Sequence, residues 1–147
     1  GYGGGYGDLD TLPFFDNYYA GGPRSVRGFV ANSLGPRELS FSNNPTGGNL
    51  KMVGSIELLA PPPVGGELEK TLRFGLFLDA GNVWLTQDNP WVVPPTGFNI
   101  DETRFSTGVM ATWLSPIGAL SISVGYPLNA KTDDETQIFQ FGVGQTF

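Results

Sequence analysis

The chain has 147 residues, of which 22 are Gly and 12 are Pro, and it carries a formal net charge of −6. It contains no Cys and no His, which excludes disulfides, thiol or Ser-His-Asp catalysis and ordinary zinc sites. The negative charge and the eight scattered basic residues argue against a nucleic-acid-binding surface. The acidic run Asp133-Asp134-Glu135 is more typical of a charged turn than of a calcium loop, so we expect neither an enzyme nor a cofactor.

Residues 1–49 are predicted to form one long loop, because they contain no convincing strand pattern. Loops of this length in a compact domain are usually functional or disordered. Within it, the stretch Gly21–Phe29 places two arginines around a Ser-Val pair, between glycines that let the backbone turn tightly on both sides. Taken alone, this stretch fits a solvated surface loop.

After residue 49, apolar and polar residues alternate as they do in strands with one apolar face. The alternation predicts five strands of roughly ten residues: Leu50–Leu59, Leu72–Trp84, Arg104–Leu114, Ala119–Leu128 and Gln137–Phe147. They are joined by a Pro-rich segment at 61–70, a long loop at 86–103, a short turn at 115–118 and a polar loop at 129–135. The short turn, Ser115-Pro116-Ile117-Gly118, has residues that a type I turn favours.

Strand length and aromatic placement favour a membrane barrel. About nine to eleven tilted residues carry a β-strand across a bilayer. Aromatic side chains are expected at both interfaces, with Trp84, Phe105 and Tyr126 on the outside and Trp113 and Phe147 on the periplasmic side. Five antiparallel strands cannot close a barrel, so we expect an all-β fragment whose free edges make it self-associate. A soluble β-sandwich that serves as a binding module is the alternative from a different class.

Four motifs carry a resemblance to a known family. Val26-Arg27-Gly28-Phe29, preceded by Tyr19-Ala20-Gly21-Gly22, resembles the family's signature in a long loop folded back into the barrel lumen. Phe77-Leu78-Asp79-Ala80-Gly81-Asn82-Val83-Trp84 resembles the strand motif that faces this loop. The segments Trp113–Gly118 and Phe139–Phe147 resemble the last hairpin and the terminal strand. Over nearly its whole length, the chain resembles the C-terminal part of the outer-membrane assembly and polypeptide-transport barrel superfamily.

The resemblance implies the last five strands of a sixteen-stranded transmembrane barrel in the bacterial outer membrane. Residues 1–49 would be the lumenal loop and residues 50–147 the membrane strands. The implied function is the folding and insertion of outer-membrane proteins by strand addition at a barrel seam, without covalent chemistry. Its implied partners are unfolded outer-membrane proteins, accessory assembly lipoproteins and the lipid bilayer. A polypeptide secretion pore of the same superfamily is the alternative, because it shares the loop motif.

The expected site residues fall into three groups. The resemblance gives the lumenal loop motif Val26, Arg27, Gly28 and Phe29, the loop-contacting strand motif Phe77, Asp79 and Gly81, and the terminal seam strand with Phe139, Phe141, Val143 and Phe147. Phe147 is expected either to be recognised during biogenesis or to anchor the strand at the interface. Gly142 and Gly144 are expected either to weaken the edge or to let it bend.

The loop motif leads to a specific contact prediction. Strand parity puts Asp79 on the lumenal face, two residues beyond Phe77. An arginine that leaves bulk water needs a partner, so we predict an ion pair between Arg27 and Asp79 with the ring of Phe77 stacked on the guanidinium. Glu57 on the adjacent strand is the second candidate partner. Gly28 is expected to let the loop backbone approach the wall.

Overall fold

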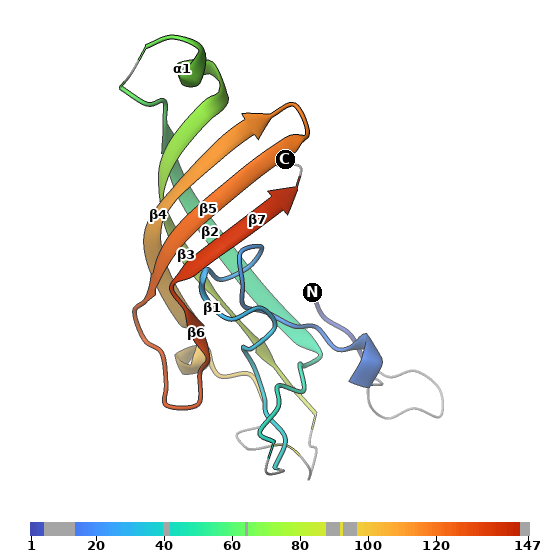
Figure 1. The fold of residues 1–147 in the computed structure, drawn as a ribbon. Coiled ribbons are helices and arrows are strands. Elements are labelled where there is room, and N and C mark those ends of the chain that lie inside the picture. The colour runs from blue at the N-terminus through green and yellow to red at the C-terminus, as the bar shows by residue number, and fades with distance from the viewer. Residues whose placement is uncertain (5–13, 40–41, 64, 88–91, 93–96, 145–147) are drawn as a thin grey trace.

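The computed structural model describes residues 1–4, 14–39, 42–63, 65–87, 92 and 97–144. A five-stranded antiparallel sheet in the order β2-β3-β4-β5-β7 forms most of the structure, and a small second sheet pairs β1 with β6 (Figure 1). The strands are β1 (Gly28–Phe29), β2 (Leu50–Ala60), β3 (Leu72–Trp84), β4 (Arg104–Ser115), β5 (Gly118–Pro127), β6 (Thr136–Gln137) and β7 (Phe139–Gly144). The helical segments are η1 (Phe14–Asp16), α1 (Glu67–Thr71) and η2 (Ile100–Glu102).

The large sheet is open, and β2 and β7 are its two edges. Each strand pairs with the next one along the chain except across β6, as expected for successive hairpins. The turn between β4 and β5 contains only Pro116 and Ile117, with Ser115 paired to Gly118. Gly118 has a φ of +132°, which a residue with a side chain rarely adopts. The predicted five-stranded, open antiparallel sheet is confirmed.

The two faces of the sheet differ as the alternation predicts. On one face the apolar side chains are exposed, including those of Leu76, Val109 and Phe141. On the other face polar side chains are buried, among them those of Asp79, Ser106 and Gln140. An apolar face that no second sheet covers, within the described part of the chain, argues against the β-sandwich alternative and fits a surface that faces lipid.

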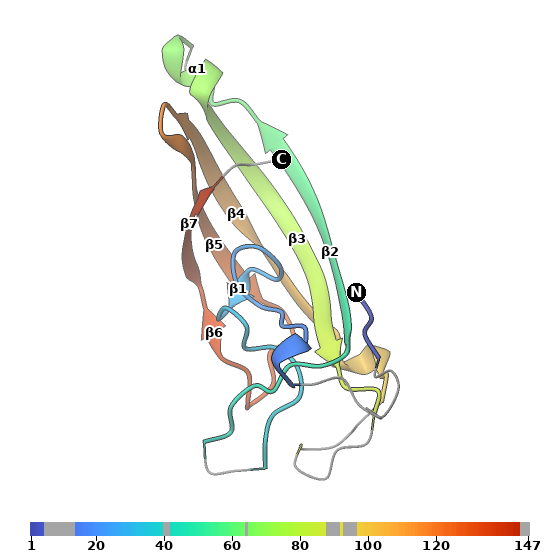
Figure 2. The same ribbon diagram turned by 90° about the vertical axis from the view of Figure 1, so that its right-hand side faces the viewer.

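The concave polar face is covered by the N-terminal part of the chain. Figure 2 shows the segment around β1 lying inside the curve of the sheet. We call residues 14–39 and 42–49 the inner loop. Its apolar side chains form the buried core together with one residue of the sheet: Ala20, Val26, Phe29, Leu34 and Val83. The core therefore lies between the inner loop and the sheet.

Two segments outside the predicted strands contain short elements that the sequence did not predict. The inner loop contains a two-residue strand, β1, which pairs with β6 far along the chain and has no local pattern of its own. The Pro-rich connection contains α1, whose first turn carries Glu67 and Glu69 and whose last turn carries Lys70. This arrangement of charges suits the helix dipole. Among the described residues, no helix is long and apolar enough to cross a membrane.

The terminal strand was expected to be one segment, Gln137–Phe147, but it is divided. β6 ends at Gln137, β7 begins at Phe139, and the backbone bends at Ile138 between them. The division arises because β6 leaves β5 to pair with the inner loop, whereas β7 stays paired with β5.

Trp84 was expected among the exposed aromatic side chains at the membrane interface, but the structure buries it. Its side chain is only 4% exposed, its indole Nε1 donates a hydrogen bond to the Asn99 carbonyl at 2.8 Å, and its ring lies 5.0 Å from that of Phe98. The loop before η2 therefore covers it. Phe105, Tyr126 and Trp113, by contrast, are exposed.

Candidate functional site

The motif-bearing part of the inner loop is a tight, internally bonded turn. Gly21 and Gly22 have φ values of +104° and +94°, and the Gly22 amide donates to the Val26 carbonyl at 3.1 Å. The hydroxyl of Ser25 bridges the amide and the carbonyl of Gly21, both at 2.8 Å. The turn leaves Arg24 exposed and directs Arg27 toward the sheet, where it is buried.

Arg27 meets Asp79 of β3 in a two-pronged contact. The Nε atom donates to Oδ2 and the Nη2 atom to Oδ1, both at 2.7 Å, and the backbone amide of Arg27 donates to Oδ2 at 3.0 Å. The side chain of Asp79 is completely buried and that of Arg27 is 9% exposed. A paired guanidinium and carboxylate satisfy each other where neither could stay charged alone. The predicted contact is therefore present.

The remaining faces of the guanidinium are also occupied. The Oε1 atom of Glu57 on β2 forms a second ion pair with Nη2 at 2.7 Å. The Ser55 hydroxyl oxygen accepts a hydrogen bond from the same Nη2 atom at 2.9 Å. The guanidinium carbon lies 3.8 Å from the centre of the Phe77 ring, as the predicted stacking requires. Burial alone would lower the pKa of Arg27, because it disfavours the charged form. The hydrogen bonds and negative charges of Asp79 and Glu57 outweigh this effect and raise the pKa of Arg27. The group is firmly cationic.

Glycines in the inner loop and in the sheet let the two approach each other closely. Gly28 has a φ of +89°, and a Cβ placed on Gly125 of β5 would lie 2.8 Å from the Gly28 nitrogen. The predicted approach of Gly28 to the wall is present, and the wall at this point is β5. Gly81 of β3 leaves room for the side chain of Val26, since a Cβ at Gly81 would lie 3.1 Å from a methyl carbon of Val26.

The other end of the motif contacts the terminal strand. β1 pairs with β6, so that Gly28 faces Gln137 and Phe29 faces Thr136. The side chain of Gln140 on β7 is 3% exposed and its Nε2 donates to the Phe29 carbonyl at 2.6 Å. The inner loop therefore crosses the concave face from the β2 edge to the β7 edge.

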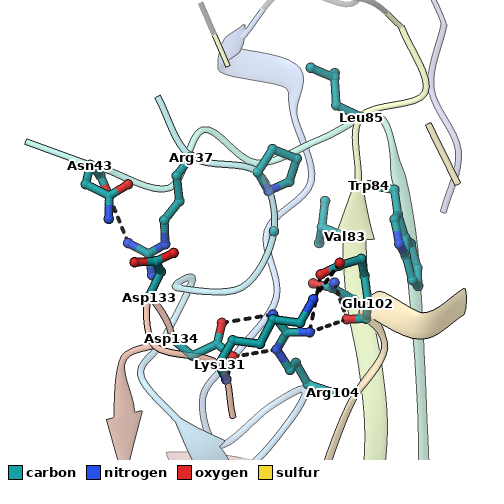
Figure 3. Close-up of a pocket in the computed structure, with 13 residues that line it drawn as sticks. Arg37, Asn43, Val83, Trp84, Leu85, Glu102, Arg104, Lys131, Asp133 and Asp134 are labelled. Atoms are coloured by element: carbon teal, nitrogen blue, oxygen red, sulfur yellow. Dashed lines mark hydrogen bonds and ion pairs between the residues drawn. The ribbon is translucent and has the colours of Figure 1, made fainter. Parts of the chain in front are cut away.

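A second polar cluster lies where the strands meet their loops (Figure 3). There Arg104 of β4 pairs with Asp134, and Lys131 pairs with Glu102. Arg37 of the inner loop is buried beside the same pocket, which has a volume of about 280 Å³. Each cation is paired, and among the described residues no group of three or more acidic side chains is placed to hold a metal ion. The cluster holds the 129–135 loop against β4 and the inner loop.

The structure brings two of the three predicted groups together. The loop motif and the β3 motif form one buried cluster. Phe139, Phe141 and Val143 lie apart from it on the exposed outer face of β7, at 58%, 55% and 56% exposure, and Phe147 lies outside the described residues.

Sequence reasoning missed Ser55, Gly125 and Gln140 as contacts of this cluster. Gln140 could have been found, because it alternates with Phe139 and Phe141 and therefore faces inward. The others are short or absent side chains whose role depends on the register between strands, which no local pattern reveals.

Comparison with known proteins agrees with this geometry. The profile of the Omp85 superfamily domain matches residues 1–147. The chain is 40% identical over its whole length to the outer membrane protein assembly factor BamA of Neisseria meningitidis serogroup B (strain ATCC BAA-335 / MC58), of which it covers 21%. It is 30% identical to the human sorting and assembly machinery component 50 homolog, over 90% of the chain and 29% of that relative.

Among solved structures, the crystal structure of BamA from Haemophilus ducreyi lacking POTRA domains 1–3 superposes with a TM-score of 0.80. The match has 34% sequence identity and covers 99% of the chain and 30% of that structure. The open sheet therefore corresponds to part of that barrel, and the chain spans less than a third of the length of each of these relatives.

Proposed function

The chain belongs to the Omp85 superfamily, as part of the barrel of an outer-membrane assembly factor, and on this premise we propose that it supplies the C-terminal side of the seam at which outer-membrane proteins are folded and inserted. The relatives described above are assembly factors and not classical enzymes, and this chain is not one either. The proposed location is the bacterial outer membrane, since the Neisseria relative is bacterial, although the family also includes a human member.

The observation that carries the proposal is the edge strand β7. One side of β7 pairs with β5, and the other side has no partner strand among the described residues. Unpaired backbone groups in hydrocarbon cost several kcal/mol each, so a strand edge inside the membrane strongly favours pairing with another strand. An unfolded outer-membrane protein that docks its first strand there by β-augmentation gains these bonds before its own sheet is complete.

The inner loop supports this role by fixing the wall behind the edge. Its contacts extend from Ser55 and Glu57 on one edge strand to Gln140 on the other. A wall held by buried polar contacts at both edges keeps its curvature while its outer edge exchanges partners.

The proposed partners are unfolded outer-membrane proteins, accessory assembly lipoproteins and the bilayer, which the exposed apolar face suits. Phe147 is proposed either to be recognised when the protein itself is inserted or to anchor its strand at the interface. A secretion pore of the same superfamily is the competing function, and the assembly factors among the relatives favour the first proposal.

Reconstitution tests the proposal. The full-length protein is placed in lipid vesicles, and the folding of an added unfolded outer-membrane protein is followed by its resistance to protease and its shift on unheated gels. Faster folding of the client into the membrane than in empty vesicles supports assembly. Client that accumulates intact inside the vesicles identifies a secretion pore, and no effect on the client removes both functions.

A further inference from the structure

The terminal strand is held in two different ways along its length. Residues 134–140 make hydrogen bonds or ion pairs to β4, β5 and the inner loop. Residues 141–144 behave differently, since every hydrogen bond and strand pairing that they make within the described part of the chain goes to β5. The boundary falls just after Gln140.

The contacts of the first part are numerous, and those made by side chains are partly or fully buried. The amide of Val30 donates to the Glu135 carbonyl at 2.9 Å, and the side chain of Glu135 pairs with Arg37 at 3.3 Å. β6 then pairs with β1 over two residues. Figure 1 shows β6 running beside β1 on the concave side while β7 continues along β5.

Gln140 is the last of these contacts and the most buried. Its amide lies on the inner face of β7, opposite Ser123, and donates to the carbonyl of Phe29. Phe29 is only two residues from Arg27, which is fixed to Asp79. The bond from Gln140 therefore joins the terminal strand to a loop that is itself fixed to the middle of the sheet.

From residue 141 to residue 144, where the described part of the strand ends, the inner face has no side chain that could make such a bond. The next two inward positions are Gly142 and Gly144, and the neighbouring Val143 is 56% exposed. Strand glycines contribute no packing, so the pairing of this part with β5 rests on the backbone, on the Ser121 hydroxyl that donates to the Gly142 carbonyl, and on outward side chains.

We propose that Gln140 is a positioning residue of the seam: by holding the Phe29 carbonyl, it fixes residues 134–140 to the inner loop and confines opening of the terminal strand to residues 141–144. The inference rests on the proposed function, which makes β7 the seam strand. Gln140 acts through the inner loop and touches no client. In the protein as a whole, it sets how much of the edge is offered for strand addition.

Hydrogen exchange of the full-length protein in lipid vesicles, read by mass spectrometry, tests this role. In the unaltered protein we expect slow exchange over residues 134–140 and at the Val30 amide, and faster exchange over residues 141–144. In Gln140→Leu, which removes the donor, exchange at Val30 and over 134–140 becomes about tenfold faster, the effect of losing one buried hydrogen bond. Exchange over 76–80 of β3 stays unchanged, which separates a local release from general destabilisation.

Two further variants make the test specific. Gln140→Met keeps the length of the side chain but has no donor, so it should release the same residues as Gln140→Leu. Gln137→Leu changes an exposed glutamine of β6 whose backbone alone takes part in pairing, and it should leave the exchange pattern unaltered.

The proposal is overturned by equal protection from hydrogen exchange across residues 134–144 in the unaltered protein. It is also overturned by unchanged exchange at Val30 in both Gln140 variants. Client folding is measured in the same vesicles. A step in protection after Gln140 without any client folding would remove the proposed assembly function and leave the loop-to-strand attachment standing. Client folding without a step in protection after Gln140 would remove the proposed role of Gln140 and leave the assembly function standing.

Discussion

Arg27 and Asp79 lie 52 positions apart and meet in a buried contact with two parallel hydrogen bonds of 2.7 Å. Asp79 is fully buried, and the Ser55 hydroxyl donates a further bond of 2.6 Å to its Oδ1. The carboxylate thus accepts bonds from both the inner loop and β2. This one side chain holds the loop to two strands of the sheet.

Loss of this ion pair should be costly. Arg27→Ala or Asp79→Ala leaves the other charge buried without its main partner, so we expect the free energy of unfolding of the full-length protein to fall by about 3–5 kcal/mol. Arg27→Lys should restore little, because an ammonium group cannot make both parallel bonds. Urea titration of the protein in lipid vesicles measures the effect.

Arg24 is the matched control for these variants. It lies on the same loop, its side chain is exposed, and the described residues offer it no ion-pair partner. Arg24→Ala should change the free energy of unfolding by less than about 0.5 kcal/mol. Equal losses in Arg24→Ala and Arg27→Ala would mean that loop charge in general, and not the Asp79 contact, stabilises the fold.

A methyl group at Gly125 should separate the inner loop from β5. The added Cβ would lie 2.8 Å from the backbone nitrogen of Gly28, and backbone cannot move aside as a flexible side chain does. We expect Gly125→Ala to lower the free energy of unfolding by about 1–3 kcal/mol. Gly54→Ala on β2 meets no atom within 4 Å and should be neutral or stabilising, by up to about 1 kcal/mol. Similar behaviour of the two variants would refute a close backbone contact.

Strand alternation made most of the sheet predictable. β3 was bounded correctly from the sequence, and β2 to within one residue, because each has a continuous apolar face. The Arg27 contact was also predictable, since parity left Asp79 as the acid on the inner face of its strand. These features depend on local pattern or on charge that must be paired.

The features that were missed depend on distant partners. β1 and β6 are each two residues long and exist only because they pair with each other, so neither has a pattern to detect. The burial of Trp84 depends on where the loop carrying Asn99 folds, and alternation alone predicted an exposed ring. α1 was hidden by the prolines and glycines that precede it.

Trp84 and Trp113 should respond differently to lipid. By strand alternation both side chains belong to the outer face, but Trp84 is 4% exposed and Trp113 is 47% exposed. In single-tryptophan variants of the full-length protein, we expect brominated lipids to quench the fluorescence of Trp113 strongly and that of Trp84 weakly. Equal quenching would show that the Asn99 loop does not cover Trp84 in the membrane.

The isolated 147-residue chain should associate with itself. Among the described residues, β2 beyond Lys51 and the outer edge of β7 pair with no further strand, and the outer face exposes a continuous set of apolar side chains. Such edges and surfaces drive strand pairing between copies. Light scattering in plain buffer should therefore report oligomers or aggregates, whereas a stable monomer would argue that these surfaces are covered.

Site-specific photo-crosslinking in the full-length protein tests strand addition at β7. A photoreactive residue is placed at Val143 on β7 or at Val109 on β4, two valines of the outer face with 56% and 51% exposure, and an outer-membrane protein is stalled during insertion. If client strands add at β7, the client crosslinks to position 143 and not to position 109, which lies in the middle of the sheet between β3 and β5. Equal crosslinking from both positions, or crosslinking from position 109 alone, would contradict strand addition at β7.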